Sequence, residues 1–176
     1  MQPLLTDAEY ALLSPLIPGG GRPAPERRRT LDGIFHVVMS RCIWADMPAR
    51  FGKPDAAQRQ LRRWMRKGVL DTWLVAARSD AFASLRERIC RAWRRVSRLA
   101  CLGSVLLAKR LAEGVGMRAA LPAAEYHLPD PALSESVKKL VLRHLDDPWR
   151  APRGFFALAG KLLKQAGGDL RRWRVR

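Results

Sequence analysis

The sequence predicts an all-α protein, because apolar residues recur at helical spacing in successive segments while strand signals are too few to build a sheet. We expect a helix-turn-helix N-terminal domain, then a long amphipathic helix, then a small helical C-terminal region. The clearest stripe follows the i, i+3, i+4, i+7, i+8, i+11 pattern and comprises Leu31, Ile34, Phe35, Val38, Met39 and Cys42.

The charge is extreme and is spread along the whole chain. The 176 residues carry a formal net charge of +17. The excess of Lys and Arg over Asp and Glu is +6 in residues 1–70, +6 in residues 71–118 and +5 in residues 119–176. We therefore expect a polyanionic partner, with nucleic acid as the leading candidate. A membrane surface is the weaker alternative, since one basic helix would be enough for it.

Several classes of protein are disfavoured by what the sequence lacks. The three cysteines, Cys42, Cys90 and Cys101, include no C-x-x-C pair, which indicates a reducing cytoplasm and no zinc site. There is no signal-peptide pattern at the N-terminus and no run of 18 apolar residues. No nucleotide-binding or hydrolase motif occurs, so we predict no cofactor, no metal and no small-molecule substrate.

Two helices are expected at the start of the chain. Thr6 and Glu9 form a capping-box pattern, which predicts a helix that begins at Asp7 and ends near Ser14. A Gly- and Pro-rich loop follows over residues 18–26, and a second helix is expected over residues 26–42.

The next segment has the order of a helix-turn-helix. A short helix is expected over residues 45–50, a tight turn at Gly52, and a longer helix that starts at Pro54 and ends before Gly68. The longer helix should bury Ala57, Leu61, Trp64 and Met65 and turn the following side chains outward: Asp55, Gln58, Arg59, Arg62, Arg63 and Arg66.

This basic face has two interpretations. A basic helix is usually a solvated surface. DNA contact is favoured here because acidic i,i+4 partners are nearly absent, and because Gln58 among arginines offers the amide geometry that reads adenine while arginine reads guanine. We therefore predict DNA-binding roles for Lys53, Gln58, Arg59, Arg62, Arg63, Arg66 and Lys67.

Residues 5–75 resemble the N-terminal domain of insertion-sequence transposases of the IS-five type, which carry a DDE catalytic domain further on. The matching pieces are LTDAEYALLSPLIP (5–18), GRP (21–23), RRTLDGIFHVV (28–38), CIWADMPARFG (42–52) and RQLRRWMRKGVLDTWL (59–74). The resemblance implies a helix-turn-helix that binds the terminal inverted repeats of the element. It also implies a basic loop around Arg22 that reaches a groove or phosphates, with a plain turn as the alternative. Where the family usually has Gly, this chain has Arg41.

The resemblance weakens after residue 75. Residues 71–100 are expected to form one long amphipathic helix that packs into the core or, alternatively, forms a dimer seam. Residues 101–116 faintly resemble the first catalytic strand of the family, with Gly103 at the position of the first catalytic Asp. Because the later acids do not form a DDE pattern, we expect no strand cleavage by this chain. We assign residues 76–118 to a second domain.

The third domain, residues 119–176, is expected to be helical and basic. Helices are predicted over residues 131–145, with 134 as an alternative start, and over residues 154–166. The final segment, 169–176, carries Trp173 among arginines, and it is either a phosphate-binding tail or a frayed end.

The sequence thus predicts a bacterial, cytoplasmic and nucleoid-associated protein that binds double-stranded DNA. It would be a truncated or domesticated transposase without DDE catalysis. Two alternatives stay open: the DNA-binding part of an active or split transposase, and a helical inhibitor that pairs with a full-length transposase. A homodimer is also open.

Overall fold

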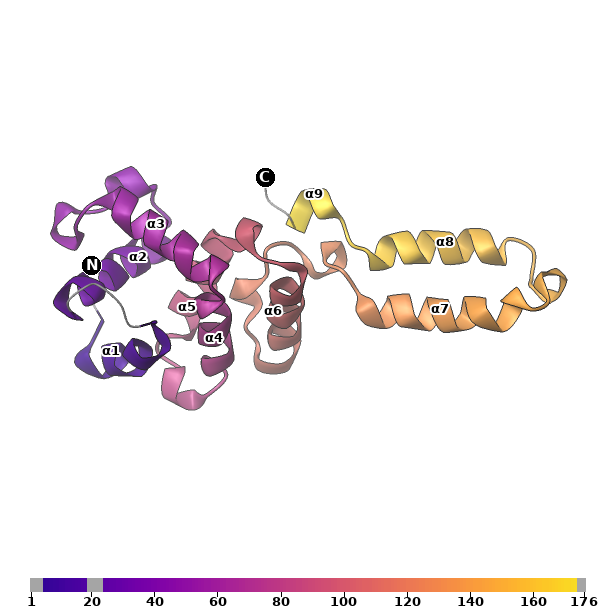
Figure 1. Cartoon of the computed structure of the whole chain (residues 1–176), viewed down its shortest axis with the longest axis horizontal. Coiled ribbons are helices and arrows are strands. Elements are labelled where there is room, and N and C mark those ends of the chain that lie inside the picture. The colour runs from indigo at the N-terminus through magenta and orange to yellow at the C-terminus, as the bar shows by residue number, and fades with distance from the viewer. Residues whose placement is uncertain (1–4, 19–23, 174–176) are drawn as a thin grey trace. The chain divides into compact units, whose positions relative to one another are not determined.

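The computed structural model describes residues 5–18 and 24–173, and within these ranges every regular element is a helix (Figure 1). The prediction of an all-α protein is confirmed. The chain divides into two compact units, an N-terminal unit, Met1–Leu121, and a C-terminal unit, Pro122–Arg176. The predicted domain boundaries after residues 75 and 118 stay predictions, since a compact unit and a sequence domain need not coincide.

The N-terminal unit is a cluster of α-helices, most of which are connected through 3-10 turns. Its α-helices are α1 (Asp7–Leu13), α2 (Ala24–Ser40), α3 (Pro54–Arg66), α4 (Val69–Ala76), α5 (Arg86–Arg95) and α6 (Leu102–Val115). The 3-10 turns are η1 (Ser14–Leu16), η2 (Trp44–Asp46), η3 (Ala49–Phe51), η4 (Asp80–Phe82), η5 (Ser97–Leu99) and η6 (Arg118–Ala120). The predicted start of α1 is confirmed, whereas α2 begins and ends two residues earlier than predicted.

The core of this unit is built around two buried tryptophans. Trp73 on α4 and Trp93 on α5 are both fully buried. The Trp73 ring lies 5.3 Å from that of Trp64 on α3 and 6.2 Å from that of Phe35 on α2, measured between centroids. These contacts hold α2, α3 and α4 together, and each buried aromatic side chain contributes a large apolar area.

A carboxylate ties three helices together beside this aromatic cluster. Asp71 on α4 accepts a hydrogen bond from Nε1 of Trp93 at 2.8 Å and another from the hydroxyl of Ser104 on α6. Both donor residues, Trp93 and Ser104, are buried. The carboxylate therefore fixes the depth and rotation of α5 and α6 against α4, since a buried indole N–H left without an acceptor would be destabilising.

The predicted long helix over residues 71–100 is wrong. The chain turns after α4 and returns as α5, so both segments present their apolar stripes to the same core. The Ser79 hydroxyl accepts from Ala81 N–H at 3.3 Å and starts the turn. The Arg86 guanidinium donates to the Ala77 carbonyl at 2.8 Å and stabilises the open end of α4. Periodicity cannot reveal this, because the 3–4 spacing continues in phase through the turn.

Two further expectations are corrected. The short helix predicted over residues 45–50 is the pair of 3-10 turns η2 and η3, because Pro48 lacks an N–H and holds Met47 before it in an extended conformation. Residues 102–115 form α6 rather than a strand, and Gly103 lies exposed in the first turn of that helix. The run Leu106–Glu113 consists mainly of strong helix formers, which explains the preference.

The C-terminal unit is a helical hairpin. Helix α7 (Pro131–Leu145) and helix α8 (Phe155–Ala166) lie side by side, as Figure 1 shows, and agree with the two predicted helices. The remaining elements are η7 (Glu125–His127), η8 (Pro148–Arg150) and α9 (Leu170–Trp173). Of the predicted tail, residues 174–176 lie outside the described residues. Within the part that is described, no helix has the length and apolar composition to cross a bilayer.

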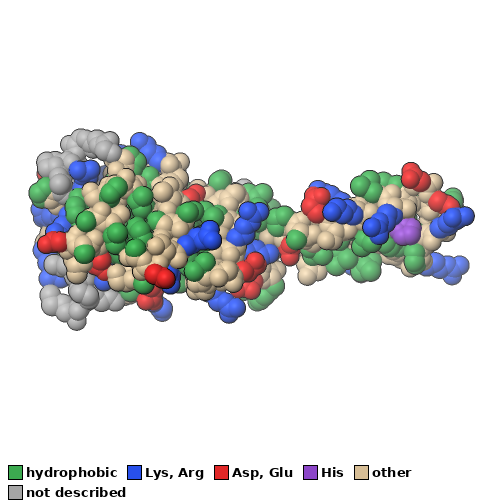
Figure 2. Space-filling view, turned by 90° about the horizontal axis from the view of Figure 1, so that it is seen from below, with side chains coloured by type: hydrophobic (Ala, Val, Ile, Leu, Met, Phe, Trp, Pro, Cys, Tyr) green, Lys and Arg blue, Asp and Glu red, His purple; other side chains and the backbone are tan. Residues whose placement is uncertain are grey.

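Helices α7 and α8 leave part of each apolar stripe exposed to solvent. In α7 and α8 only Val137, Ala159 and Ala166 are buried. Figure 2 shows hydrophobic side chains on the surface of this unit. The large exposed ones are Tyr126, Leu140, Leu142, Leu145, Trp149, Phe156, Leu158, Leu163 and Leu170.

One buried ion pair links the first helix to α5. Glu9 completes the predicted capping box, in which its carboxylate accepts from Thr6 N–H at 3.0 Å. The same oxygen accepts from Arg88 at 3.1 Å. Burial works against ionisation of Glu9, but the hydrogen bonds from Thr6 and Ser84 and the charge of Arg88 outweigh it and lower the pKa of this carboxyl.

We predict that Glu9→Gln lowers the free energy of unfolding by about 1.5–3 kcal/mol at pH 7, since a charge-assisted hydrogen bond is lost. Because the folded-state pKa of Glu9 is lowered, its contribution is present above its ordinary value of 4.5 and is lost as the pH falls below it. Urea unfolding from pH 7 to pH 3 should therefore show the two proteins converging in acid. Burial raises the pKa of Asp32, with a smaller contribution from the charge of Glu9, so the substitution partly relieves Asp32 and this acts against the gap. A gap that stays constant with pH would contradict the assignment.

Candidate nucleic-acid interface

The turn before the basic helix α3 is held in place by a side chain of α2. Gly52 adopts a left-handed φ of 94°, and Pro54 occupies the first turn of the helix, where its missing N–H is not needed. Arg29 on α2 donates to the carbonyl of Arg50 at 2.8 Å and to that of Ala49 at 3.4 Å. The start of α3 is thereby held against α2.

The two faces of α3 separate as predicted. The four predicted core residues, Ala57, Leu61, Trp64 and Met65, are all buried. On the other side Arg62 and Gln58 are half-buried, and the exposed charged positions are Lys53, Asp55, Arg59, Arg63, Arg66 and Lys67. The sequence and the structure therefore agree on which side of the helix faces solvent.

The exposed arginines of α3 are not neutralised within the protein. Arg59, Arg63 and Arg66 form no ion pair and no side-chain hydrogen bond with any residue that the structure describes. Arg59 and Arg63, four residues apart, repel each other on the helix surface. A helix selected for stability alone would alternate its charges, so this face is suited to an external anion.

Gln58 has a second role that the sequence did not reveal. With its amide in the orientation that satisfies both neighbours, its oxygen accepts from Nε1 of Trp44 at 3.3 Å and from the Arg62 guanidinium at 3.2 Å. The bidentate reading of adenine needs that oxygen. Gln58 would have to release Trp44 and Arg62 in order to make this contact.

The remaining candidate residues divide into two groups. Arg22 lies outside the described residues, so its predicted contact with DNA stays a prediction. Arg28 forms an ion pair with Asp7 and donates to the Leu5 carbonyl at 2.8 Å. The basic run Arg27–Arg29 is also a candidate for phosphate contacts from the sequence; Arg28 and Arg29 are engaged within the protein, so that assignment stays a prediction.

The geometry of α3 suits a DNA groove. Its 13 residues span about 20 Å, and the major groove of B-DNA is wide enough to admit an α-helix. Guanidinium groups bind guanine edges or phosphate oxygens in a bidentate manner. The presence of a helix-turn-helix in the strict sense stays a prediction, because η2 and η3 replace the α-helix expected before the turn.

The region that contains α3 matches a known protein family. Residues 5–74 match the family model “Putative transposase of IS4/5 family (DUF4096)”. The IS4/5 match contains α1, α2, α3 and most of α4, and it confirms the resemblance of the N-terminal region. No curated protein and no solved structure matches the chain.

Beyond the IS4/5 match, sequence reasoning missed a second group of basic residues. Arg91, Arg94 and Arg95 lie on α5 at i, i+3 and i+4, a spacing that places them on neighbouring positions of the helix surface. This signal was present in the sequence but was interpreted as the polar side of the long helix. Within the described ranges, no group of three or more His, Cys, Asp and Glu side chains is placed to hold a metal ion.

We predict that Arg29→Ala lowers the free energy of unfolding by about 1–2 kcal/mol, because the two carbonyls before α3 lose their donor. The matched control is Arg59→Ala, which removes the same side chain from an exposed site without a partner and should not lower stability. Thermal or urea unfolding at one ionic strength measures both. Equal effects of the two substitutions would contradict the distinction between structural and free arginines.

Proposed function

We propose that this protein binds double-stranded DNA in a sequence-dependent manner through the exposed face of α3, and that it does not itself cut DNA. The observation that carries the proposal is the row Arg59, Arg63 and Arg66, exposed and without internal partners on a helix whose opposite face is buried. The match of residues 5–74 to a transposase family supports the same partner. A DNA-binding protein of this kind would be associated with the nucleoid.

The division of labour on this surface follows from the chemistry of the side chains. Lys53 and Lys67 lie at the two ends of α3 and are suited to phosphates, because an ammonium group acts as a point charge. The arginines between them are suited to guanine edges. Phosphate contacts would set the affinity and its salt dependence, while the arginines would set the sequence preference.

The proposal that the chain lacks cleavage activity rests on its carboxylates. Two-metal strand cleavage needs several carboxylates around one point. Glu9 and Asp71 are engaged in the core by Arg88, Trp93 and Ser104. The acids that follow residue 100 are Glu113, Glu125, Asp130, Glu135, Asp146, Asp147 and Asp169.

A split transposase, with its catalytic part on another chain, is tested by adding a full-length transposase and Mg²⁺ and looking for nicks in labelled DNA.

We predict that Arg62→Ala and Arg63→Ala each weaken binding to a preferred duplex by about 1–3 kcal/mol while changing non-specific binding much less. Arg63→Ala is the cleaner test, since Arg63 has no partner among the described residues and its loss should not disturb the fold. Arg143→Ala on α7 removes one exposed charge far along the sequence and serves as the control. Fluorescence anisotropy at fixed salt measures all of them. If Arg63→Ala and Arg143→Ala bind the preferred duplex equally well, α3 does not read DNA.

A second candidate function, pairing with another chain, is favoured by the exposed leucines of the α7–α8 hairpin. Leu142 is 62% exposed and Leu158 is 57% exposed. A second copy of the hairpin would complete a four-helix arrangement and cover them. We predict a dimer by light scattering at micromolar concentration and a shift to monomer for Leu142→Glu. A wild-type monomer that does not associate with full-length transposase would contradict this candidate.

A further inference from the structure

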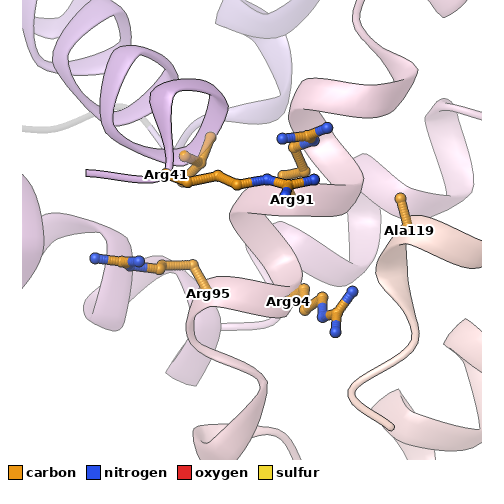
Figure 3. A pocket seen from close by; sticks show the side chains of 6 residues that line it. Arg41, Arg91, Arg94, Arg95 and Ala119 are labelled. Carbon is orange, nitrogen blue, oxygen red and sulfur yellow. The ribbon is translucent and has the colours of Figure 1, made fainter. Parts of the chain in front are cut away.

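Four arginines line a hollow on the N-terminal unit, outside the face of α3. The hollow has a volume of about 550 Å³ and lies where the end of α2 approaches α5 and η6. Figure 3 shows Arg41 extending from the end of α2 toward Arg91, while Arg94 and Arg95 project from the next turn of α5. Its lining comprises Val38, Arg41, Arg91, Arg94, Arg95 and Ala119.

The positive charge of this hollow is only partly used inside the protein. Arg91 forms an ion pair with Glu87 and donates to the Met39 carbonyl at 3.5 Å. Arg95 donates to the Cys42 carbonyl at 3.1 Å. Arg41 and Arg94 form no ion pair and no side-chain hydrogen bond with the described residues. Within the part of the chain that the structure describes, the lining of the hollow thus holds four guanidinium groups and no carboxylate, and two of those groups, on Arg41 and Arg94, keep their donors free.

Arg41 occupies a backbone position that ordinarily suits glycine. It follows the last residue of α2 and has φ of 56°, the left-handed conformation with which helices often end. A side chain with a Cβ is disfavoured there. Arg41 is the only residue other than glycine with a positive φ in the described ranges. The strained backbone places a fourth guanidinium group at the rim of the hollow.

We propose that this hollow is a phosphate-binding site, which takes a phosphate of the DNA backbone or of a small polyphosphate. Guanidinium groups bind phosphate oxygens through two parallel hydrogen bonds, and several of them around one hollow can surround a single phosphate. Arg41 and Arg94 supply the free donors. Arg91 is a positioning residue, since its ion pair with Glu87 holds it in place.

The site is connected to α3 through Trp44. The guanidinium carbon of Arg95 lies 5.9 Å from the centroid of the Trp44 ring, a cation–π contact. On the other side Nε1 of the same indole donates to Gln58 of α3. A duplex held by α3 would therefore have a second set of arginines next to it. The DNA source of the phosphate rests on the proposed function, whereas the small polyphosphate does not.

A purely structural role accounts for part of the cluster. The carbonyls of Met39 and Cys42, at and beyond the end of α2, accept from Arg91 and Arg95, and cations at a helix C-terminus are favourable. Arg41 and Arg94 make no such contact. These two arginines are therefore the ones whose substitution separates ligand binding from stability.

The first test uses inorganic pyrophosphate and no DNA. The full-length chain is melted with and without pyrophosphate, alongside Arg41→Gly, Arg41→Lys, Arg94→Ala and the control Arg143→Ala. We expect pyrophosphate to raise the melting temperature of the wild type, Arg41→Lys and Arg143→Ala. Arg41→Gly should melt at or above the wild-type temperature without pyrophosphate, because the backbone strain is relieved, and should lose the pyrophosphate-dependent rise. Arg94→Ala should also lose it.

The second test measures the affinity for a duplex at several salt concentrations. If the site holds a backbone phosphate, the slope of log affinity against log salt becomes shallower by about 0.9 in Arg41→Gly and in Arg94→Ala. Loss of the pyrophosphate effect with an unchanged slope assigns the site to a small polyphosphate. Wild-type responses of both variants in both tests overturn the proposal. If the wild type binds no duplex, the proposed function fails while the pyrophosphate test still decides this site.

Discussion

The packing of Trp64 on α3 against Trp73 on α4 determines which side of α3 reaches solvent. The two rings lie 5.3 Å apart, and Trp73 is fully buried. Since the apolar stripe of α3 is narrow, burying Trp64 leaves one orientation for the rest of the helix. Arg59, Arg63 and Arg66 then point outward together. The free basic surface is thus a consequence of the core, and a change in that packing would rotate the arginines away from their common direction.

The same core explains how a strongly basic chain folds. Its internal carboxylates are few, and the ones that are well placed act as ties: Glu9 joins the start of α1 to Arg88, and Asp71 joins Trp93 to Ser104. Several arginines donate hydrogen bonds to backbone carbonyls instead, as Arg29 and Arg86 show. Among the arginines without an internal partner in the described residues are Arg59, Arg63 and Arg66 on α3 and Arg41 and Arg94 at the hollow. The two surfaces meet at Trp44, which contacts Gln58 on one side and Arg95 on the other.

The sequence predicted the parts of the fold that depend on local periodicity. Most of the stripe of α2, up to Val38, and the two faces of α3 followed from residue spacing, whereas Cys42 lies beyond the end of α2; the family resemblance agreed with the match over residues 5–74. The long helix was wrong because α4 and α5 share one phase of apolar spacing, while the turn between them depends on Arg86 reaching back to Ala77, a contact invisible to periodicity. The role of Arg41 was equally hidden, since the departure from glycine was visible but its position beside α5 requires the folded chain.

The central claim is that α3 still reads DNA sequence. The most direct measurement is the selection of bound sequences from a random duplex pool at about 150 mM salt, where non-specific charge attraction is screened. The account predicts an enriched motif of several base pairs that is lost in Arg63→Ala. Recovery of unenriched sequences, with binding that disappears as the salt concentration rises, would contradict it and would leave α3 as a charged surface without sequence preference.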